Sequence, residues 1–467
     1  MIATGATGSA PPTPITPLEA FLRRHSDTRY LDAILCDLSC VMRGKRYPIA
    51  MADKVFTGGM MLPGSSFLLA VTGDSLDPEG MGFSDGDPDE VAMPIDGTLV
   101  PVPWNRHPTA QVMLTLQSPD GEPYYFDPRN VLARVVERFH ELNLRPVVAF
   151  ELEFYLLDPA HDNGRCLRPP PSGARGQRSD ATQVYSIDQV EDFSHYLHEV
   201  TEACAQQGVT CGAISAEYAP GQFEINLHHS DNPLAAADQC VMFRRVVRGV
   251  ARKHELQGTF MAKPHTAGAG SGLHLHISLR NEHGENAFAG DPEAGFATPA
   301  CASPLLLHAI GGLRETMAEA MAIFAPNINS HRRFVPNSYV PVRPNWGYEN
   351  RSVALRVPKS PGHARRIEHR VSGADANPYL TLAALLAGIH HGITNRIDAG
   401  QPARGNAGQT PHPELPFDPP SALEKCRHGK ILPAYLGHRY LNAYCSCKLS
   451  EYHAFVKHDQ AEAGWYL

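Results

Sequence analysis

Four stretches of the chain carry chemically capable side chains at every second position. Glu151 and Glu153 alternate with apolar residues, and the same alternation recurs in three later stretches. Because alternate residues of a strand project from one side of a sheet, each stretch predicts a strand with one active face and one apolar face. The residues of the active faces are Glu151 and Glu153; Gln222, Glu224 and Asn226; His274, His276 and Ser278; and Arg366, Glu368 and Arg370.

The residue types on these faces indicate metal-assisted chemistry on an anionic substrate. Glutamates with one or two histidines suit Mg²⁺ or Mn²⁺, whereas zinc normally recruits more His and Cys. Arginines beside them imply a phosphate or a carboxylate. Any single stretch could instead be an edge strand with a wetted face. Taken together, carboxylates, metal and arginines on one surface suggest phosphoryl transfer from a nucleotide.

The elements that must position these faces follow from turn and capping signals. A capping box at Thr16 and Glu19 predicts a first helix, and Asp127-Pro128 predicts a second one. Residues 32–117 between them indicate short strands and turns. Beyond them, strand-like stretches alternate with amphipathic helices over 232–254 and 377–396. We therefore place a domain boundary within 118–126.

Composition excludes several classes of protein. The net charge of −8 and the absence of basic runs argue against a nucleic-acid-binding protein. No apolar stretch is long enough to cross a bilayer, which argues against a membrane protein. Residues 1–15 have no secretory signal and are expected to be a disordered leader. The ten cysteines form no C-x-x-C pair, so we expect reduced thiols and a cytoplasmic location.

The active stretches, in order, resemble motifs of the glutamine synthetase family. Glu151-Leu-Glu-Phe-Tyr is similar to its E-x-E-F-F strand, and Glu217-Tyr-Ala-Pro-Gly-Gln-Phe-Glu to its E-x-A-P-G-Q-x-E motif. Further matches are Phe260-Met-Ala-Lys-Pro, Gly270-Ser-Gly-Leu-His-Leu-His, Asn350-Arg-Ser and Ala364-Arg-Arg-Ile-Glu-His-Arg. The resemblance covers nearly the whole chain after the leader.

The resemblance implies a role for each matching residue. The implied metal ligands hold two to three Mg²⁺ or Mn²⁺ ions: Glu153, Glu217 and Glu224 near glutamate, and Glu151, His274 and Glu368 near the ATP phosphates. The implied glutamate contacts are Arg333, Arg370 and the Gly270 carbonyl. The implied phosphate contacts are Arg351, Arg356 and Arg366, and the implied nucleotide contacts are His276 and Ser278.

Two departures from the family pattern bear on the nitrogen substrate. Pro63 stands where members that use ammonia carry an Asp, and Tyr339 stands where they carry a Glu in the flap. A third change puts Ala269 in place of an Asn. Losing two carboxylates removes groups that attract ammonium, so the resemblance implies ligation of glutamate to a primary amine such as a polyamine. The alternatives are a glutamine synthetase that uses ammonia and a non-catalytic binding protein, although all six metal-ligand positions are intact.

The resemblance also implies an α+β architecture. A small β-rich, β-grasp-like N-terminal domain over 16–126 is expected to precede a catalytic domain over 127–467. The catalytic domain is expected to have a curved antiparallel sheet with flanking helices. Family members form stacked rings with sites between neighbouring subunits, so Pro63 is expected to face a neighbour. The expected partners are glutamate, ATP, a primary amine and other copies of the chain.

Overall fold

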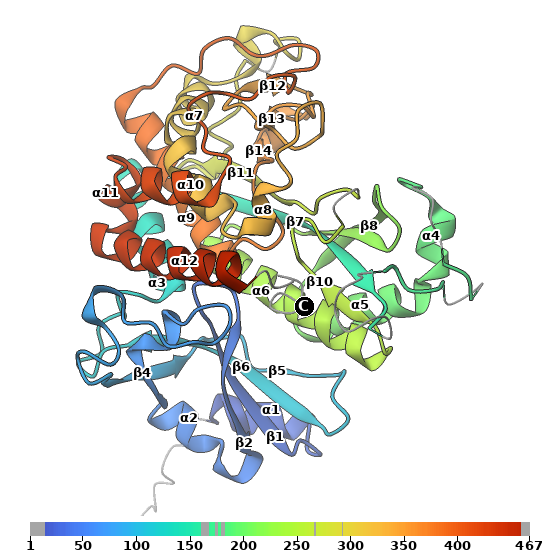
Figure 1. Ribbon diagram of the computed structural model, residues 1–467, viewed down its shortest axis with the longest axis vertical. Helices are drawn as coiled ribbons and strands as arrows, with labels where there is room; N and C mark the ends of the chain where they lie inside the picture. Colours follow the sequence, from blue (N-terminus) through green and yellow to red (C-terminus); the bar gives the residue numbers. More distant parts are fainter. Residues whose placement is uncertain are drawn as a thin grey trace, which may run out of the picture.

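The described residues form two β-sheets, and helices pack against the second one (Figure 1). The computed structural model describes residues 15–159, 168–172, 176–178, 183–265, 268–291 and 293–458. Residues 1–14, and so nearly all of the expected leader, lie outside this part. The α+β class predicted from the sequence is confirmed, and the first sheet is drawn in blue below the second one.

The first sheet has the strand order β2-β1-β6-β4-β3, with β5 paired to β6. Only β1 and β6 run parallel among its pairs. Helix α1 (Pro17–Arg24) begins at the predicted capping box, and α2 (Asp53–Thr57) precedes β3. The strands are β1 (Tyr30–Cys36), β2 (Met42–Pro48), β3 (Met60–Pro63), β4 (Asp89–Pro94), β5 (Val100–Pro101) and β6 (Thr109–Gln117).

The second sheet has the order β12-β13-β14-β11-β7-β9-β8, with β10 paired to β7. It is antiparallel, as expected, except between β12 and β13. All four predicted strands are present, but the last is a strand over Ile367–His369 only, shorter than the predicted stretch. The strands are β7 (Arg145–Leu157), β8 (Cys211–Ala216), β9 (Gln222–Leu227), β10 (Gln257–Thr259), β11 (Leu273–Arg280), β12 (Trp346–Tyr348), β13 (Leu355–Val357) and β14 (Ile367–His369).

Helices α3, α6 and α9 were predicted from the sequence, and each begins directly after a residue whose side chain caps it. These N-cap residues are Asp127, Asn232 and Asn377. Of the described helices, none combines the length and apolarity that a membrane span requires. The helices that follow the first sheet are α3 (Pro128–Glu137), α4 (Ile187–Asp192), α5 (Ser194–Gln206), α6 (Pro233–Lys253), α7 (Pro304–Phe324), α8 (Ile328–His331), α9 (Pro378–Asn395), α10 (Pro419–Arg427), α11 (Leu432–Leu436) and α12 (His438–His458).

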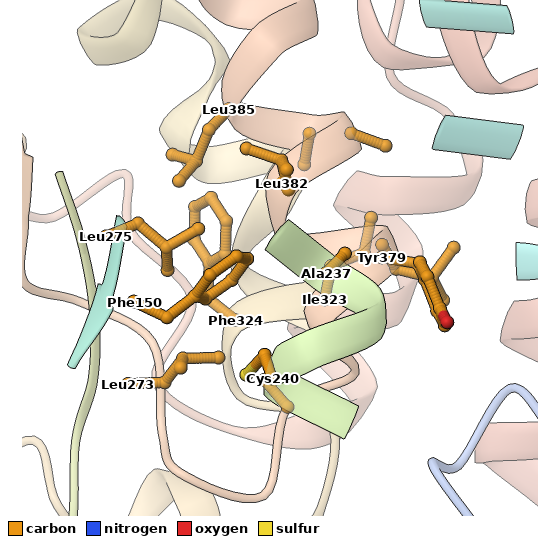
Figure 2. Close-up of a cluster of buried hydrophobic side chains, with 14 of the residues drawn as sticks. Phe150, Ala237, Cys240, Leu273, Leu275, Ile323, Phe324, Tyr379, Leu382 and Leu385 are labelled. Atoms are coloured by element: carbon orange, nitrogen blue, oxygen red, sulfur yellow. The ribbon is translucent and has the colours of Figure 1, made fainter. Parts of the chain in front are cut away.

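The apolar face of the second sheet packs against α6, α7 and α9. Figure 2 shows Phe150 of β7 and Leu275 of β11 directed toward Phe324 of α7 and Leu385 of α9. All four side chains are buried, so the burial of apolar area holds the sheet against these helices. Because side chains alternate along a strand, the polar residues of β7 and β11 must occupy the opposite face.

Candidate functional site

Strand register brings the acidic and imidazole side chains of the second sheet together. His274 of β11 lies opposite Glu151 of β7, and His276 lies opposite Glu368 of β14. On the other side of β7, Glu153 lies opposite Glu224 of β9. The His276 Nε2 atom is 2.7 Å from Glu151 Oε1, and His274 Nδ1 is 3.7 Å from Glu151 Oε2. We call this surface the acidic face: Glu151, Glu153, Glu217, Glu224, Glu368, His274 and His276.

Two overlapping groups on the acidic face have metal-binding geometry. Within each, one ligand atom per residue lies within 4.8 Å of the others, and Glu151 belongs to both. The groups are Glu151, His276 and Glu368, and Glu151, Glu224 and His274. Four of the six predicted ligands therefore converge. His276, predicted as a nucleotide contact, sits among them.

The other two predicted ligands, Glu153 and Glu217, lie beside these groups. Glu153 Oε2 accepts hydrogen bonds from the Gly272 N–H at 2.9 Å and from Gln222 Nε2 at 3.2 Å. Glu217 follows β8, and its N–H donates to the Gln222 carbonyl oxygen at 2.9 Å. Gln222 thus links Glu153 of β7 to the segment that carries Glu217. Its position on the active face was visible in the sequence, but this linking role was not predicted.

Burial and mutual repulsion disfavour ionisation of three of these carboxyls. Burial raises the pKa of Glu153 to about 7, helped by the charge of Glu217. Burial and the charge of Glu224 raise the pKa of Glu217 to about 7. Burial, followed by the charges of Glu151 and Glu153, raises the pKa of Glu224 to about 8. A bound cation would favour the ionised forms of all three carboxyls.

Histidine and arginine neighbours offset the burial of Glu151 and Glu368. Burial acts to raise the pKa of Glu151, but the charge of His276 and hydrogen bonds from both histidines lower it overall. Burial likewise opposes ionisation of Glu368, but Arg370 and the histidines, with Arg356, lower its pKa to about 2. Glu368 pairs with Arg370 and, at 2.8 Å, with Arg356 Nη1.

The donor set of the acidic face fits hard divalent cations. Carboxylate oxygens predominate, and imidazole nitrogens supply the remainder. This composition suits Mg²⁺ or Mn²⁺ better than zinc. The repulsion among Glu153, Glu217 and Glu224 would be relieved by such ions. The number of ions stays a prediction.

The residues predicted to contact glutamate lie beside Glu153. Arg333 is buried, and its Nη1 donates to the Val371 carbonyl oxygen at 3.0 Å. Burial lowers the pKa of Arg333, which the charge of Glu153 opposes. The Gly270 carbonyl oxygen accepts from Gln222 Nε2 at 3.1 Å. Arg370 is buried against Glu368. Their contact with glutamate stays a prediction.

The arginines predicted to contact phosphate differ in their surroundings. Arg356 bonds Glu368 and Glu349, and Arg366 Nε donates to His276 Nδ1 at 3.1 Å. Arg351 is exposed, and its Nη1 donates to the Tyr185 hydroxyl at 3.4 Å. Ser278 is half-buried on β11. Arg356 and Arg366 thus form hydrogen bonds with residues of the acidic face, Glu368 and His276.

Three exposed tyrosines, Tyr185, Tyr218 and Tyr339, lie near Glu217 and Arg351, and only Tyr339 was singled out from the sequence. The rings of Tyr218 and Tyr339 lie 5.6 Å apart and are 42% and 57% exposed. Tyr218 directly follows Glu217. Tyr185 has a φ of 62°, which is uncommon for a bulky residue, and its N–H donates to the Ala216 carbonyl oxygen at 2.8 Å. Adjacency to Glu217 was the only sequence signal for Tyr218.

Comparison with known proteins supplies independent information. The model of the glutamine synthetase catalytic domain matches residues 125–466. Gamma-glutamylputrescine synthetase PuuA of Escherichia coli K12 is 39% identical, covering 96% of this chain and 94% of the relative. The glutamate–isopropylamine ligase of a Pseudomonas species is 32% identical, covering 92% of this chain and 93% of the relative. The solved structure of apo GmaS without ligand matches with a TM-score of 0.80 at 25% identity, covering 95% of this chain and 96% of that structure's chain.

Proposed function

Because the chain belongs to the glutamine synthetase family, we propose that it is an ATP-dependent ligase that joins the γ-carboxylate of glutamate to a primary amine. The named activities of two relatives, a gamma-glutamylputrescine synthetase and a glutamate–isopropylamine ligase, support this acceptor class. The domain division at 16–126 and 127–467 belongs to the same proposal, and the family match beginning at residue 125 supports it.

The choice of acceptor rests on the pair of exposed tyrosines beside Glu217, Tyr218 and Tyr339. Tyr339 occupies the flap position where members using ammonia carry a glutamate, and its exposed ring lies beside that of Tyr218. A phenol is a poor base at neutral pH, so Tyr339 does not replace the glutamate as a proton acceptor. An aromatic face does attract an alkylammonium group and packs against its carbon chain. The pair therefore suits an amine better than ammonia.

The acidic face would hold the metal ions. Glu153, Glu217 and Glu224 would bind the ion nearest glutamate, and Glu151, His274 and Glu368 the ion nearest the ATP phosphates. Bound ions neutralise phosphate charge during transfer. Arg356 and Arg366 lie next to Glu368 and His276, which suits contacts with the same phosphates. His276 and Ser278 would contact the nucleotide, and Arg333, Arg370 and the Gly270 carbonyl would orient glutamate.

The reaction we propose has two steps. A γ-carboxylate oxygen of glutamate attacks the γ-phosphorus of ATP, the bond to ADP breaks, and γ-glutamyl phosphate forms. Arg351, which donates to the Tyr185 hydroxyl, would stabilise the transferring phosphoryl group. The amine nitrogen then attacks the acyl carbon, phosphate departs, and the nitrogen loses a proton. Glu217, which adjoins Tyr218, and the departing phosphate are the candidates for accepting that proton.

The proposal extends to assembly and location. Stacked rings would place Pro63, at the end of β3, against a neighbouring subunit's site. A cytoplasmic location agrees with the cysteines of the described residues, which are all free thiols.

A phosphate-release screen tests the function directly. Full-length enzyme, glutamate, ATP and Mg²⁺ are combined with ammonium, monoamines, diamines, polyamines or amino alcohols. We expect a much higher kcat/KM for at least one amine than for ammonium. Glutamate labelled with oxygen-18 in its side-chain carboxylate should pass label to the released phosphate. Efficient glutamine formation with no response to any amine would establish the ammonia alternative, and no turnover at all would favour a binding protein.

A further inference from the structure

Arg333 follows a helix that is too short to hold its own shape. Helix α8 (Ile328–His331) has only four residues, and a helix of this length is unstable without outside contacts. The Arg333 N–H donates to the carbonyl oxygen of Ser330 in this helix at 3.2 Å. The Asn329 side chain bonds the backbone of Lys263 through both its oxygen, at 2.6 Å, and its nitrogen, at 2.8 Å. The orientation of Arg333 therefore depends on the groups that hold α8.

Asp375 holds the start of α8 from the loop between β14 and α9. This carboxylate is buried, and its Oδ2 atom accepts from Asn327 Nδ2 at 2.7 Å and from the Ser330 hydroxyl at 2.6 Å. The Ser330 oxygen in turn accepts from the Asn327 N–H at 3.2 Å. One carboxylate oxygen thus fixes the residue before α8 and a residue of its only turn. Sequence analysis assigned no role to Asp375.

A buried ion pair of α12 supports Asn327 from the other side. Lys448 Nζ lies 3.4 Å from Asn327 Oδ1 and 2.9 Å from both Ser39 Oγ and Glu451 Oε2. Lys448 and Glu451 are both buried, and a buried ion pair is costly to desolvate. The oxygen of the Asn327 amide faces Lys448 and its nitrogen donates to Asp375, so the amide has one favoured orientation.

The other oxygen of Asp375 lies close to the Arg333 guanidinium. A Cβ atom placed on Gly373 would be 2.5 Å from Asp375 Oδ1 and 3.3 Å from Arg333 Nη1, so both groups border the same glycine. Burial lowers the pKa of Arg333, and the charges of Glu153 and Asp375 oppose this shift. Asp375 therefore acts on Arg333 in two ways: it holds the backbone that precedes it, and it attracts its guanidinium group.

We propose that Asp375 is a positioning residue for glutamate binding, which keeps α8 and the Arg333 guanidinium in the orientation that receives a glutamate carboxylate. The inference rests on the proposed function, in which Arg333 contacts glutamate. Asp375 carries the same charge as that carboxylate, so it acts through Arg333 and not by touching the substrate. Its removal should therefore weaken glutamate binding and leave ATP and the amine unaffected.

Steady-state kinetics of the full-length enzyme test the proposal. Glutamate, ATP and the preferred amine are varied in turn for Asp375→Ala, Asp375→Asn, Arg333→Gln and the double variant Asp375→Ala with Arg333→Gln. Calorimetric titration with glutamate in the presence of Mg²⁺ and ADP measures binding without any amine. Arg333→Lys replaces Arg333→Gln if the latter does not fold.

Asp127→Ala is the matched control. Asp127 is also a buried carboxylate that holds the start of a helix, because it accepts from the Arg129 N–H at 2.8 Å and from the Thr115 hydroxyl at 2.7 Å. It belongs to α3 and contacts no residue proposed to bind glutamate. A loss of stability alone should therefore affect Asp127→Ala and Asp375→Ala alike, whereas mispositioning of Arg333 should appear only in Asp375→Ala.

We expect Asp375→Ala to raise the KM for glutamate by about tenfold or more, with kcat and the other two KM values changed by less than about twofold. Asp375→Asn keeps one acceptor oxygen and should raise the KM for glutamate by less than about threefold. In the double variant, the loss of Asp375 should add little to the effect of Arg333→Gln, because the two residues act as one unit.

Three outcomes count against the proposal. If Arg333→Gln weakens glutamate binding and Asp375→Ala does not, the inference is wrong and the proposed function stands. If Arg333→Gln leaves glutamate binding unchanged, the proposed role of Arg333 fails and the inference fails with it. An equal rise in Asp127→Ala, or effects that multiply in the double variant, would show that Asp375 does not act through Arg333. If Asp375→Ala does not fold, Ser330→Ala decides, because it deletes one of the two hydrogen bonds to Asp375.

Discussion

The acidic face and a cavity of about 300 Å³ lined by Arg244, Arg245, Arg248 and Arg252 of α6, which we call the arginine cavity, both gather side chains of one charge. The two regions differ in the sign of that charge and in the elements that carry it. The acidic face arises from alternate positions of paired strands, so that Glu151 and Glu224 meet across β7 and β9. The arginine cavity arises from every fourth residue of α6, closed by a loop from the first sheet. On the acidic face the imbalance indicates a bound cation. In the arginine cavity, by contrast, Arg245 pairs with Asp32 and Arg244 donates to the Ala376 carbonyl oxygen, so the fold itself supports these cations.

The aromatic residues of the two regions differ in their burial and in their cation partners. Phe260 lies under Arg244 and Arg248, so the chain itself supplies the cations that its ring attracts. Tyr339 and Tyr218, which directly follows Glu217, expose their rings to solvent. An exposed aromatic pair beside carboxylates suits a cation that arrives with the substrate. Burial thus separates a structural ring from one that is available for binding.

The strongest test of the comparison removes a carboxylate from the acidic face. Glu368→Ala should lower kcat/KM by more than about a hundredfold and weaken ATP binding, because a metal ligand is lost. Glu368 is 1% exposed and pairs with two arginines, so the unfolding free energy should also fall, by about 3–5 kcal/mol. Turnover, nucleotide binding and urea unfolding are measured together at a temperature where the variant is folded.

Glu349→Gln is the matched control for that variant. Glu349 also pairs with Arg356, but it belongs to neither metal-binding group of the described residues. The Glu349→Gln variant should reduce turnover far less than Glu368→Ala. Equal losses would mean that Glu368 acts only by holding Arg356, and the acidic face would then lose its cation-binding role in the comparison.

A smaller effect is expected at the exposed Arg351. Arg351→Lys should lower kcat by about a hundredfold, because an ammonium group cannot reproduce the planar fork of guanidinium donors. Since Arg351 is exposed, the unfolding free energy should change by less than about 0.5 kcal/mol. Arg280→Lys, at an exposed pair with Asp231 on the same sheet, serves as the control. Wild-type turnover in Arg351→Lys would remove Arg351 from the catalytic machinery.

The exposed tyrosine should affect binding more than chemistry. Tyr339→Ala is expected to raise the KM for the preferred amine by about tenfold with little change in kcat, because the aromatic face contributes mainly to substrate binding. Tyr339→Phe keeps that face and should stay near the wild-type value. Steady-state kinetics with the amine and with ammonium would show the effect. An equal loss in both variants would assign the role to the hydroxyl instead.

Sequence reasoning recovered the strands of the acidic face, because a period of two is visible in a single stretch such as 146–155. It also recovered α3, α6 and α9, because their capping residues are local signals. It did not find the Tyr218–Tyr339 contact or the arginine cavity. Both join segments far apart in the chain, and their residues have ordinary explanations one at a time, such as a solvated helix face for the arginines.

The smallest expected effect concerns stability in the arginine cavity. In Arg244→Met an apolar side chain replaces a buried cation, which removes its desolvation cost. Against this gain stand the lost hydrogen bond to Ala376, about 1 kcal/mol, and the contact with Phe260, about 1 kcal/mol. The variant should therefore be as stable as the wild type to within about 1 kcal/mol, as measured by urea unfolding.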